Sequence, residues 1–197
     1  MKTIPGVPLA LLSALLCGCL RAPPPSPAEH ADPALDEAMS PESFDHALLA
    51  RAIFEASNRV RAAHGAPALV HVAALDDAAD EQATYLALSL TVGHTSPIPR
   101  QRNLAERIEG EGLKAASAGE NAIMMPARRP ADAPDRDYTY AAYAAYLMEG
   151  WMNSPEHRET LLAPRFTELG CAARLAHGLA KGDQRIFATQ VFLLPAR

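Results

Sequence analysis

The order of the predicted helices and strands is what most constrains the fold of this chain. Two early segments carry apolar residues at three- and four-residue steps, which predicts amphipathic helices over residues 44–64 and 75–90. Two late segments, residues 167–175 and 185–194, have strand composition, and the glycines between them predict an antiparallel hairpin. Because helices precede strands instead of alternating with them, the sequence favours a layered α+β domain over a doubly wound sheet.

Shorter elements are predicted between these segments. In order, they are a proline-containing loop (93–102), a short helix (104–111), a short strand (118–124), an exposed loop (126–137) and two helices (138–152 and 154–162). Pro164 follows the last of these helices and ends it.

Length and composition limit the class of protein. The chain has 197 residues, which predicts one domain and a tail, and its apolar fraction of 49% is sufficient for a core. The formal net charge is −5, and no block of Lys and Arg is present. A nucleic-acid-binding surface needs a basic stripe, so we expect no nucleic-acid partner.

The N-terminus has the features of an export signal. Lys2 supplies a positive charge, and residues 7–16 form an apolar run too short to span a bilayer. The run leads into Gly18-Cys19, which resembles a bacterial lipobox, where a small residue precedes the lipidated cysteine. This resemblance predicts a lipoprotein-type signal peptide over residues 1–18 and an acyl anchor at Cys19. An ordinary signal peptide with an incidental cysteine is the alternative.

Two consequences follow from cleavage before Cys19. Leu20 is not acidic, and by resemblance to Gram-negative lipoproteins this implies the outer membrane. Cys171 is then the only cysteine left unacylated, so no intrachain disulfide is expected, and its apolar surroundings predict a small buried side chain. Residues 19–43 are rich in Pro, Ala and acidic residues and predict a tether, which places the folded domain at residues 44–197.

Three residues on separate predicted elements are candidates for chemistry. His94 follows the second helix, Glu120 lies beside Gly119 at a strand edge, and His157 lies in the first turn of a helix. Two imidazoles and one carboxylate suffice for a zinc site with an open position or for a general acid/base pair. Both alternatives remain open from spacing alone. The other five histidines are expected to be solvated: His30, His46, His64, His71 and His177.

The helix that carries His157 has a well-marked start. Ser154 is predicted to cap it with its hydroxyl, Pro155 suits the first helical position, and Glu156 suits the positive end of the helix dipole. We therefore expect Ser154 and Glu156 to be helix-start residues and His157 to point into a pocket.

Five motifs together resemble the CAP superfamily, and most closely its bacterial branch of SCP-like extracellular proteins. In chain order they are Asn58-Arg59-Val60-Arg61, Gly93-His94-Thr95, Ala118-Gly119-Glu120-Asn121, the segment from Trp151 to Arg158, and Thr189-Gln190-Val191-Phe192. The resemblance extends from about residue 48 to residue 194. It implies a three-layer α-β-α sandwich with a central antiparallel sheet.

The resemblance also implies a pocket of two His and two Glu, which in eukaryotic members sometimes holds a divalent metal. His94 and Glu120 match two of these positions, whereas Ser154 and Phe187 stand at the other two. His157, from the bacterial motif, is expected to supply the missing imidazole and to face His94 and Glu120. Zinc bound by these three residues is the expected cofactor if there is one.

Two polar residues are expected to support this pocket. Asn121 is predicted to order the loop around Glu120 through side-chain-to-backbone bonds. Gln190 lies in an apolar strand and, if buried, needs partners that would brace the pocket. A sheet-edge amide that faces water is the alternative for Gln190.

Two functions are compatible with these features. The first is a surface-tethered binding module for a lipid, an envelope component or a protein, held to the membrane by its acyl anchor. The second is a metal-assisted hydrolase of peptide or ester bonds that uses His94, Glu120 and His157. The tether and the incomplete set of four pocket residues favour the binding module.

Overall fold

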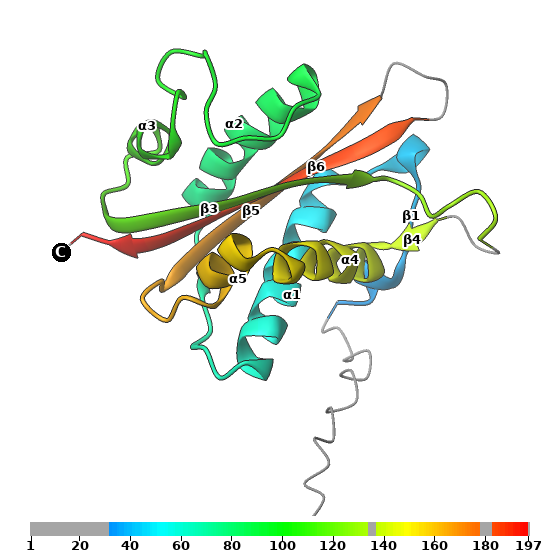
Figure 1. The fold of residues 1–197 in the computed structure, drawn as a ribbon, viewed down its shortest axis with the longest axis horizontal. Helices are drawn as coiled ribbons and strands as arrows, with labels where there is room; N and C mark the ends of the chain where they lie inside the picture. The colour runs from blue at the N-terminus through cyan, green and yellow to red at the C-terminus, as the bar shows by residue number, and fades with distance from the viewer. Residues whose placement is uncertain (1–31, 134–136, 178–182, 197) are drawn as a thin grey trace, which may run out of the picture. The chain divides into compact units, whose positions relative to one another are not determined.

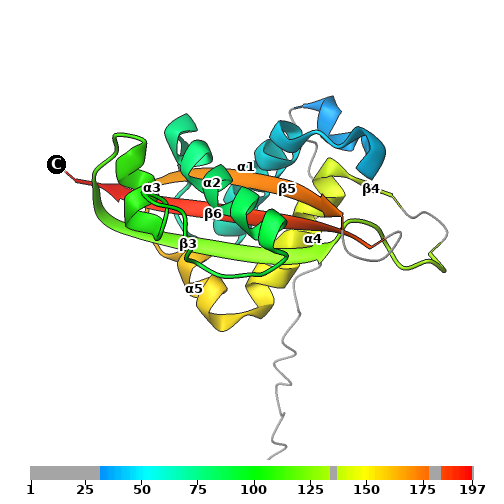
Figure 2. The same ribbon diagram turned by 90° about the horizontal axis from the view of Figure 1, so that it is seen from above.

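A four-stranded sheet lies between two layers of helices (Figures 1 and 2). The computed structural model describes residues 32–133, 137–177 and 183–196. The order in the sheet is β2-β5-β6-β3. These strands are β2 (Val70–His71), β3 (Ala115–Pro126), β5 (Glu168–His177) and β6 (Gln184–Pro195).

The predicted antiparallel pairing of the two late strands is confirmed. β5 and β6 pair from Glu168 opposite Leu193 to His177 opposite Gln184, and the connection over residues 178–182 lies outside the described residues. β3 is also antiparallel to β6. The three long strands are thus antiparallel, as expected, and the short β2 runs parallel to β5, which makes the sheet mixed. The reason is that the chain, after the helix that precedes β2, runs along the edge of β5 in the same direction as β5.

The helices follow the apolar periodicity of the sequence. They are α1 (His46–Ala63), α2 (Ala73–Ser89), α3 (Leu104–Gly110), α4 (Tyr140–Asn153) and α5 (Pro155–Leu162). α1 packs against α4 and β5, whereas α2 packs against β5, β6 and α3. The two layers therefore consist of α1, α4 and α5 on one face of the sheet and α2 and α3 on the other.

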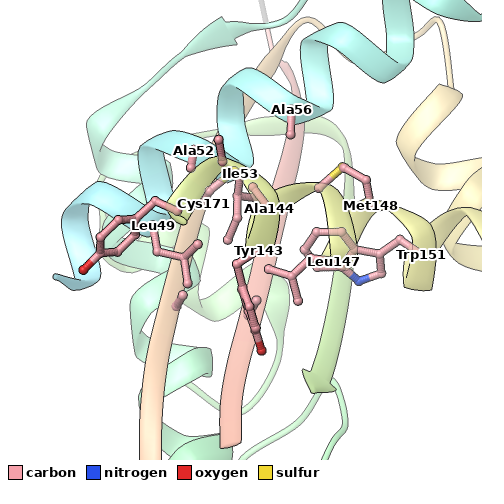
Figure 3. Close-up of a cluster of buried hydrophobic side chains, with 14 of the residues drawn as sticks. Leu49, Ala52, Ile53, Ala56, Tyr143, Ala144, Leu147, Met148, Trp151 and Cys171 are labelled. Atoms are coloured by element: carbon pink, nitrogen blue, oxygen red, sulfur yellow. The ribbon is translucent and has the colours of Figure 1, made fainter. Parts of the chain in front are cut away.

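The larger part of the core lies between α1, α4 and the sheet. Ile53 of α1 and Tyr143, Leu147 and Trp151 of α4 are each 0% exposed in this cluster (Figure 3). Cys171 of β5 belongs to the same cluster at 1% exposed, as predicted, and burial raises the pKa of its thiol. A packed core on both faces fixes the strands that carry the polar residues described below.

The folded domain begins earlier than the sequence predicted. Residues 33–36 form a 3₁₀ turn, and β1 (Ala38–Met39) pairs with β4 (Tyr138–Thr139). Leu35 and Met39 are buried at 0% and 1% exposed. The tether predicted over residues 19–43 is therefore wrong for residues 32–43, because two well-spaced apolar side chains anchor this segment on the core. The signal peptide over residues 1–18 and the anchor at Cys19 lie outside the described residues.

Among the residues that the structure describes, no helix is both long and apolar enough to span a bilayer.

Candidate functional site

His94 and Glu120 form a hydrogen-bonded pair at the surface. Nδ1 of His94, in the loop after α2, lies 2.9 Å from Oε1 of Glu120 on β3. The His94 side chain is 56% exposed, whereas that of Glu120 is only 3% exposed. The buried carboxylate thus fixes the imidazole through Nδ1, and among the described residues Nε2 has no hydrogen-bond partner and can meet a ligand.

The second oxygen of Glu120 is bonded to a buried arginine. The guanidinium of Arg107, on α3, is 0% exposed and donates to Oε2 of Glu120. It also donates to the carbonyl of Gln101 at 3.3 Å. Sequence reasoning missed Arg107, although a signal was present: Leu104, Arg107 and Ile108 share one helical stripe, so a cation stands where an apolar side chain is expected.

A buried glutamine sets the path of the loop that carries His94. Nε2 of Gln82, on α2, donates to the carbonyl of Gly93 at 2.8 Å, and the Gln82 side chain is fully buried. This bond ties the residue next to His94 to the helix. Gln82 was also missed from the sequence, although it lies on the same apolar stripe as Ala79 and Leu86.

His157 interacts with this pair through charge. Its pKa is lowered by burial and further by the nearby positive charge of His94. The pKa of His94 is raised by its hydrogen bond to Glu120, with the negative charge of Glu156 contributing in the same direction. The start of α5 therefore lies within electrostatic reach of His94. Across the described residues, however, the ring of His157 forms no hydrogen bond, so the direct pair is His94–Glu120.

Asn121 and Gln190 lie on the opposite face of the sheet from Glu120. Nδ2 of Asn121 donates to the carbonyl of His157 and to Oε1 of Gln190, both at 3.1 Å. Nε2 of Gln190 donates to the hydroxyl of Ser57 on α1 at 2.6 Å. All three side chains are 0% exposed. Asn121 thus holds the first turn of α5, rather than the loop around Glu120 as predicted, because successive strand residues face opposite sides.

The start of α5 is only partly as predicted. Ser154 occupies the N-cap position, Pro155 the first helical position and Glu156 the first turn. The hydroxyl of Ser154 forms no capping hydrogen bond, so the prediction that it satisfies a backbone N–H is wrong. The preceding helix α4 ends at Asn153, so Ser154 is both the C-cap of α4 and the N-cap of α5. The junction between the two helices therefore fixes its backbone conformation.

The residues of the site do not fit the zinc ion that the sequence left open. A zinc site needs three protein ligands with free lone pairs. Glu120 shares its two oxygens between His94 and the guanidinium of Arg107, which already supplies a positive charge there. Within residues 32–133, 137–177 and 183–196, no three His, Cys, Asp or Glu side chains are grouped to hold a metal ion.

A model of the cysteine-rich secretory protein family, CAP, matches residues 54–192 of this sequence. The chain belongs to the CAP family. This match includes His94, Glu120 and His157 and most of the helices and strands of the domain. No curated protein matches the chain.

Two solved structures share the CAP fold of this chain. One is an extracellular protein containing an SCP domain from Bacillus anthracis, with 24% identity and a TM-score of 0.56; the match covers 79% of this chain and 44% of that chain. The other is an outer surface protein from Borrelia burgdorferi, with 15% identity and a TM-score of 0.52; the match covers 82% of this chain and 99% of that chain. The chain thus spans less than half the length of the Bacillus anthracis protein.

The CAP domain described here departs from the four-residue pocket that the resemblance implied. Phe187, at the position of the second family His, is 0% exposed and packs with Leu86, Ala122 and Ala176. Ser154, at the position of the second family Glu, carries no charge. The acidic group of the site is therefore Glu120, neutralised by Arg107, and the exposed polar group is His94.

Proposed function

We propose that this CAP-domain protein is exported and acts as a binding module at the cell envelope. The observation that carries the proposal is the pairing of both Glu120 oxygens, one with His94 and one with Arg107. This buried carboxylate already accepts hydrogen bonds on both oxygens, which limits its access to a substrate, and it holds an exposed imidazole in a fixed orientation. Such a surface suits recognition of a polar group without turnover.

The residues near His94 in the sequence favour an amphipathic ligand. Among envelope components, a lipid is the ligand that we favour. Large exposed apolar side chains surround His94 in sequence: Leu88 (81%), Leu90 (37%), Val92 (51%) and Ile98 (38% exposed). Within the described residues, only Val70 is a further large apolar side chain of this kind. Several exposed apolar groups at the end of α2 and in the loop that follows it are a sign of a lipid or protein contact. His94 would then meet the polar head of the lipid.

Export and anchoring rest on two kinds of support. Two proteins with the same fold are described as an extracellular protein and an outer surface protein. The sequence adds an apolar N-terminal run and Gly18-Cys19, which resembles a lipobox. We propose that Cys19 carries an acyl anchor at the cell envelope and that, if the cell is Gram-negative, the anchored membrane is the outer one. The acyl chain and the segment of residues 88–98, which comprises the end of α2 and the loop after it, would both contact membrane.

Vesicle binding tests the proposal. Purified Cys19→Ser protein, which lacks an acyl chain, should cosediment with vesicles of phosphatidylethanolamine and phosphatidylglycerol. Adding Leu88→Ser and Val92→Ser should weaken this binding about tenfold or more, because two exposed apolar groups are lost. His94→Gln should weaken it as well. Val70→Ser changes an exposed side chain elsewhere and is the matched control. Equal binding by all variants, or none by the parent, would reject the proposal.

One observation keeps a hydrolase as the second candidate. A carboxylate bonded to Nδ1 of a histidine and leaving Nε2 free is also how acid/base histidines are oriented. We would then expect turnover on a panel of peptide and ester substrates that disappears in His94→Ala/His157→Ala. Elemental analysis of the same preparations shows whether a metal accompanies it. Turnover lost in this variant would replace the binding proposal.

A further inference from the structure

Two residues that flank the loop of His94 have an unfavourable backbone conformation. Leu90, which ends α2, has φ 53°, and Arg100, at the far end of the loop, has φ 69°. Among the residues that the structure describes, these are the non-glycine residues with positive φ. Glycine adopts this left-handed region at lower cost than leucine or arginine, so both side chains reduce the stability of the local backbone.

Glycine is the usual residue at both of these positions. A residue with positive φ that ends a helix is most often glycine, and Leu90 takes that place. The amide of Gln101 donates to the carbonyl of Ile98 at 3.1 Å, which closes a turn with Pro99 and Arg100 at its centre. A turn with proline second and positive φ third favours glycine as its third residue. Leu90 is 37% exposed and Arg100 is also exposed, so neither is held in place by the core.

The charge of this stretch differs from that of the rest of the chain. The chain has 23 acidic residues and a net charge of −5, yet residues 82–105 contain no Asp or Glu. The same residues include Arg100, Arg102 and His94, together with the four exposed apolar side chains near His94. Exposed apolar groups beside basic ones, without acidic ones, are typical of a segment that contacts an anionic membrane surface.

Arg100 is the arginine of this stretch that is available to a ligand. The guanidinium of Arg102 pairs with Glu106 of α3 at 2.5 Å. Arg100 forms no ion pair with any residue that the structure describes, and it lines a hollow of about 370 Å³ with Arg102, Glu106 and Glu109. Because Glu106 is already paired, Glu109 is the carboxylate of this hollow that competes with a ligand for Arg100.

We propose that Leu90 and Arg100 select an anionic phospholipid as the ligand of this segment. Leu90 enters the acyl region of the leaflet, and Arg100 binds the lipid phosphate, which suits the planar set of donors of a guanidinium. This inference rests on the proposed membrane binding and adds the class of lipid and the residues that select it. Glycine at either position would lower the backbone cost but would remove the apolar group or the charge.

Two vesicle compositions separate this inference from membrane binding as such. Unacylated Cys19→Ser protein should bind mixed vesicles of phosphatidylcholine and phosphatidylglycerol about fivefold more tightly than vesicles of phosphatidylcholine alone. Adding Arg100→Gln should remove most of this preference, whereas Arg100→Lys keeps the charge and should retain it. Arg165→Gln is the matched control, because Arg165 is an exposed arginine just before β5, whereas Leu86 near the end of α2 packs on Ala176 at the other end of that strand.

Leu90→Gly separates contact with the lipid from a structural role. Glycine adopts the backbone conformation of Leu90 at lower cost, so the melting temperature should stay the same or rise. Binding to the mixed vesicles should nevertheless weaken about fivefold or more, because the apolar side chain is lost. A melting temperature lowered by more than about 5 °C would show that Leu90 is retained for packing and would overturn its part in the inference.

The competing carboxylate gives a change of opposite sign. Glu109→Gln should strengthen binding to the mixed vesicles about twofold or more, because the negative charge beside Arg100 is removed. The same substitution should leave binding to phosphatidylcholine vesicles unchanged. Equal strengthening for both compositions would contradict a role of Arg100 in recognising the charge of the lipid.

Inorganic phosphate tests whether the occupant is a lipid or a free anion. In ¹⁵N NMR spectra, the amides of residues 90–96 and of Arg100 should shift on addition of short-chain phosphatidylglycerol. Sodium phosphate at the same concentration should leave them in place. Equal shifts with sodium phosphate would assign the site to free phosphate and overturn the choice of a lipid.

Two further results would overturn the inference while the proposed function stands. They are equal binding of the parent protein to both vesicle compositions, and an unchanged preference for phosphatidylglycerol in the Arg100→Gln variant. In both cases the protein still binds membrane. Absence of binding to either composition would instead reject the proposed membrane binding, and this inference with it.

Discussion

Arg107 and Glu120 form an ion pair in which the arginine side chain is 0% exposed and the glutamate side chain 3% exposed. Breaking a buried pair by removing one partner leaves the other charge without compensation. Arg107→Met should therefore lower the free energy of unfolding by roughly 3–5 kcal/mol. Urea denaturation measures the change.

The exposed pair between Arg102 and Glu106 is the control for Arg107→Met. Arg102→Ala should cost only about 0–1 kcal/mol. The double variant Arg107→Met/Glu120→Leu removes both charges and should recover part of the lost stability. If Arg107→Met were no more harmful than Arg102→Ala, the buried pair would not be an important contact.

The pKa values of His94 and His157 should lie on opposite sides of the ordinary histidine pKa. The hydrogen bond to Glu120 raises the pKa of His94, and burial lowers the pKa of His157. An NMR titration of the ring protons should show His157 losing its proton first as pH rises. Glu120→Gln should bring the pKa of His94 back down. Coincident titration of both rings would contradict the arrangement described here.

The contributions of His94 and His157 to the free energy of unfolding should change with pH in opposite directions. His94 has a raised pKa in the folded protein, so its contribution is complete below about pH 6.5 and is lost as pH rises through the folded pKa. His157 has a lowered pKa, so the unfolded chain binds its proton more readily, and stability falls as pH drops below about 6.5. Comparing the unfolding of His94→Gln and His157→Gln with wild type across pH 5–8 separates the two.

The amide of Asn121 should hold the first turn of α5. Its Nδ2 donates to the carbonyl of His157 and to Gln190, and both partners lose this donor in Asn121→Ala. Leaving buried acceptors unpaired should cost about 1–3 kcal/mol of stability. The ring resonances of His157 should also shift. Asn153→Ala, at an exposed position of α4, should change neither quantity.

Gly170 is where α2 packs directly on β5. A Cβ at this position would overlap the backbone carbonyl carbon of Leu75, and backbone cannot move aside as a flexible side chain can. Gly170→Ala should cost about 3 kcal/mol or more. A Cβ on Gly93 meets nothing within 4 Å, so Gly93→Ala is the control and should be nearly neutral. Thermal unfolding followed by circular dichroism compares the two.

The proposed acyl anchor makes its own prediction in cells. Cys19→Ser should abolish the incorporation of labelled fatty acid into the protein, because this sulfur is the proposed site of acylation. Cys17→Ser, two residues earlier, should leave this labelling unchanged. Fatty-acid labelling that survives Cys19→Ser would reject the anchor.

Local patterns in the sequence were sufficient for much of the fold. Apolar steps at Leu49, Ile53 and Ala56 predicted α1, and the same periodicity predicted α2. The glycine-rich connection predicted the pairing of β5 with β6, and the motifs around His94, Glu120 and His157 identified the family. These features are encoded by neighbours in the chain, so they can be recognised without knowing what each segment packs against.

Contacts between distant segments were decided by the tertiary structure alone. Arg107 is joined to Glu120, and Asn121 to His157, only because α3 and α5 pack on opposite faces of β3. Neither pairing has a sequence spacing that identifies it. Whether the site binds a metal also depends on these partners, since a carboxylate bonded to a buried guanidinium is chemically different from a free one. The sequence by itself determined which residues are present, and packing determined what their charges face.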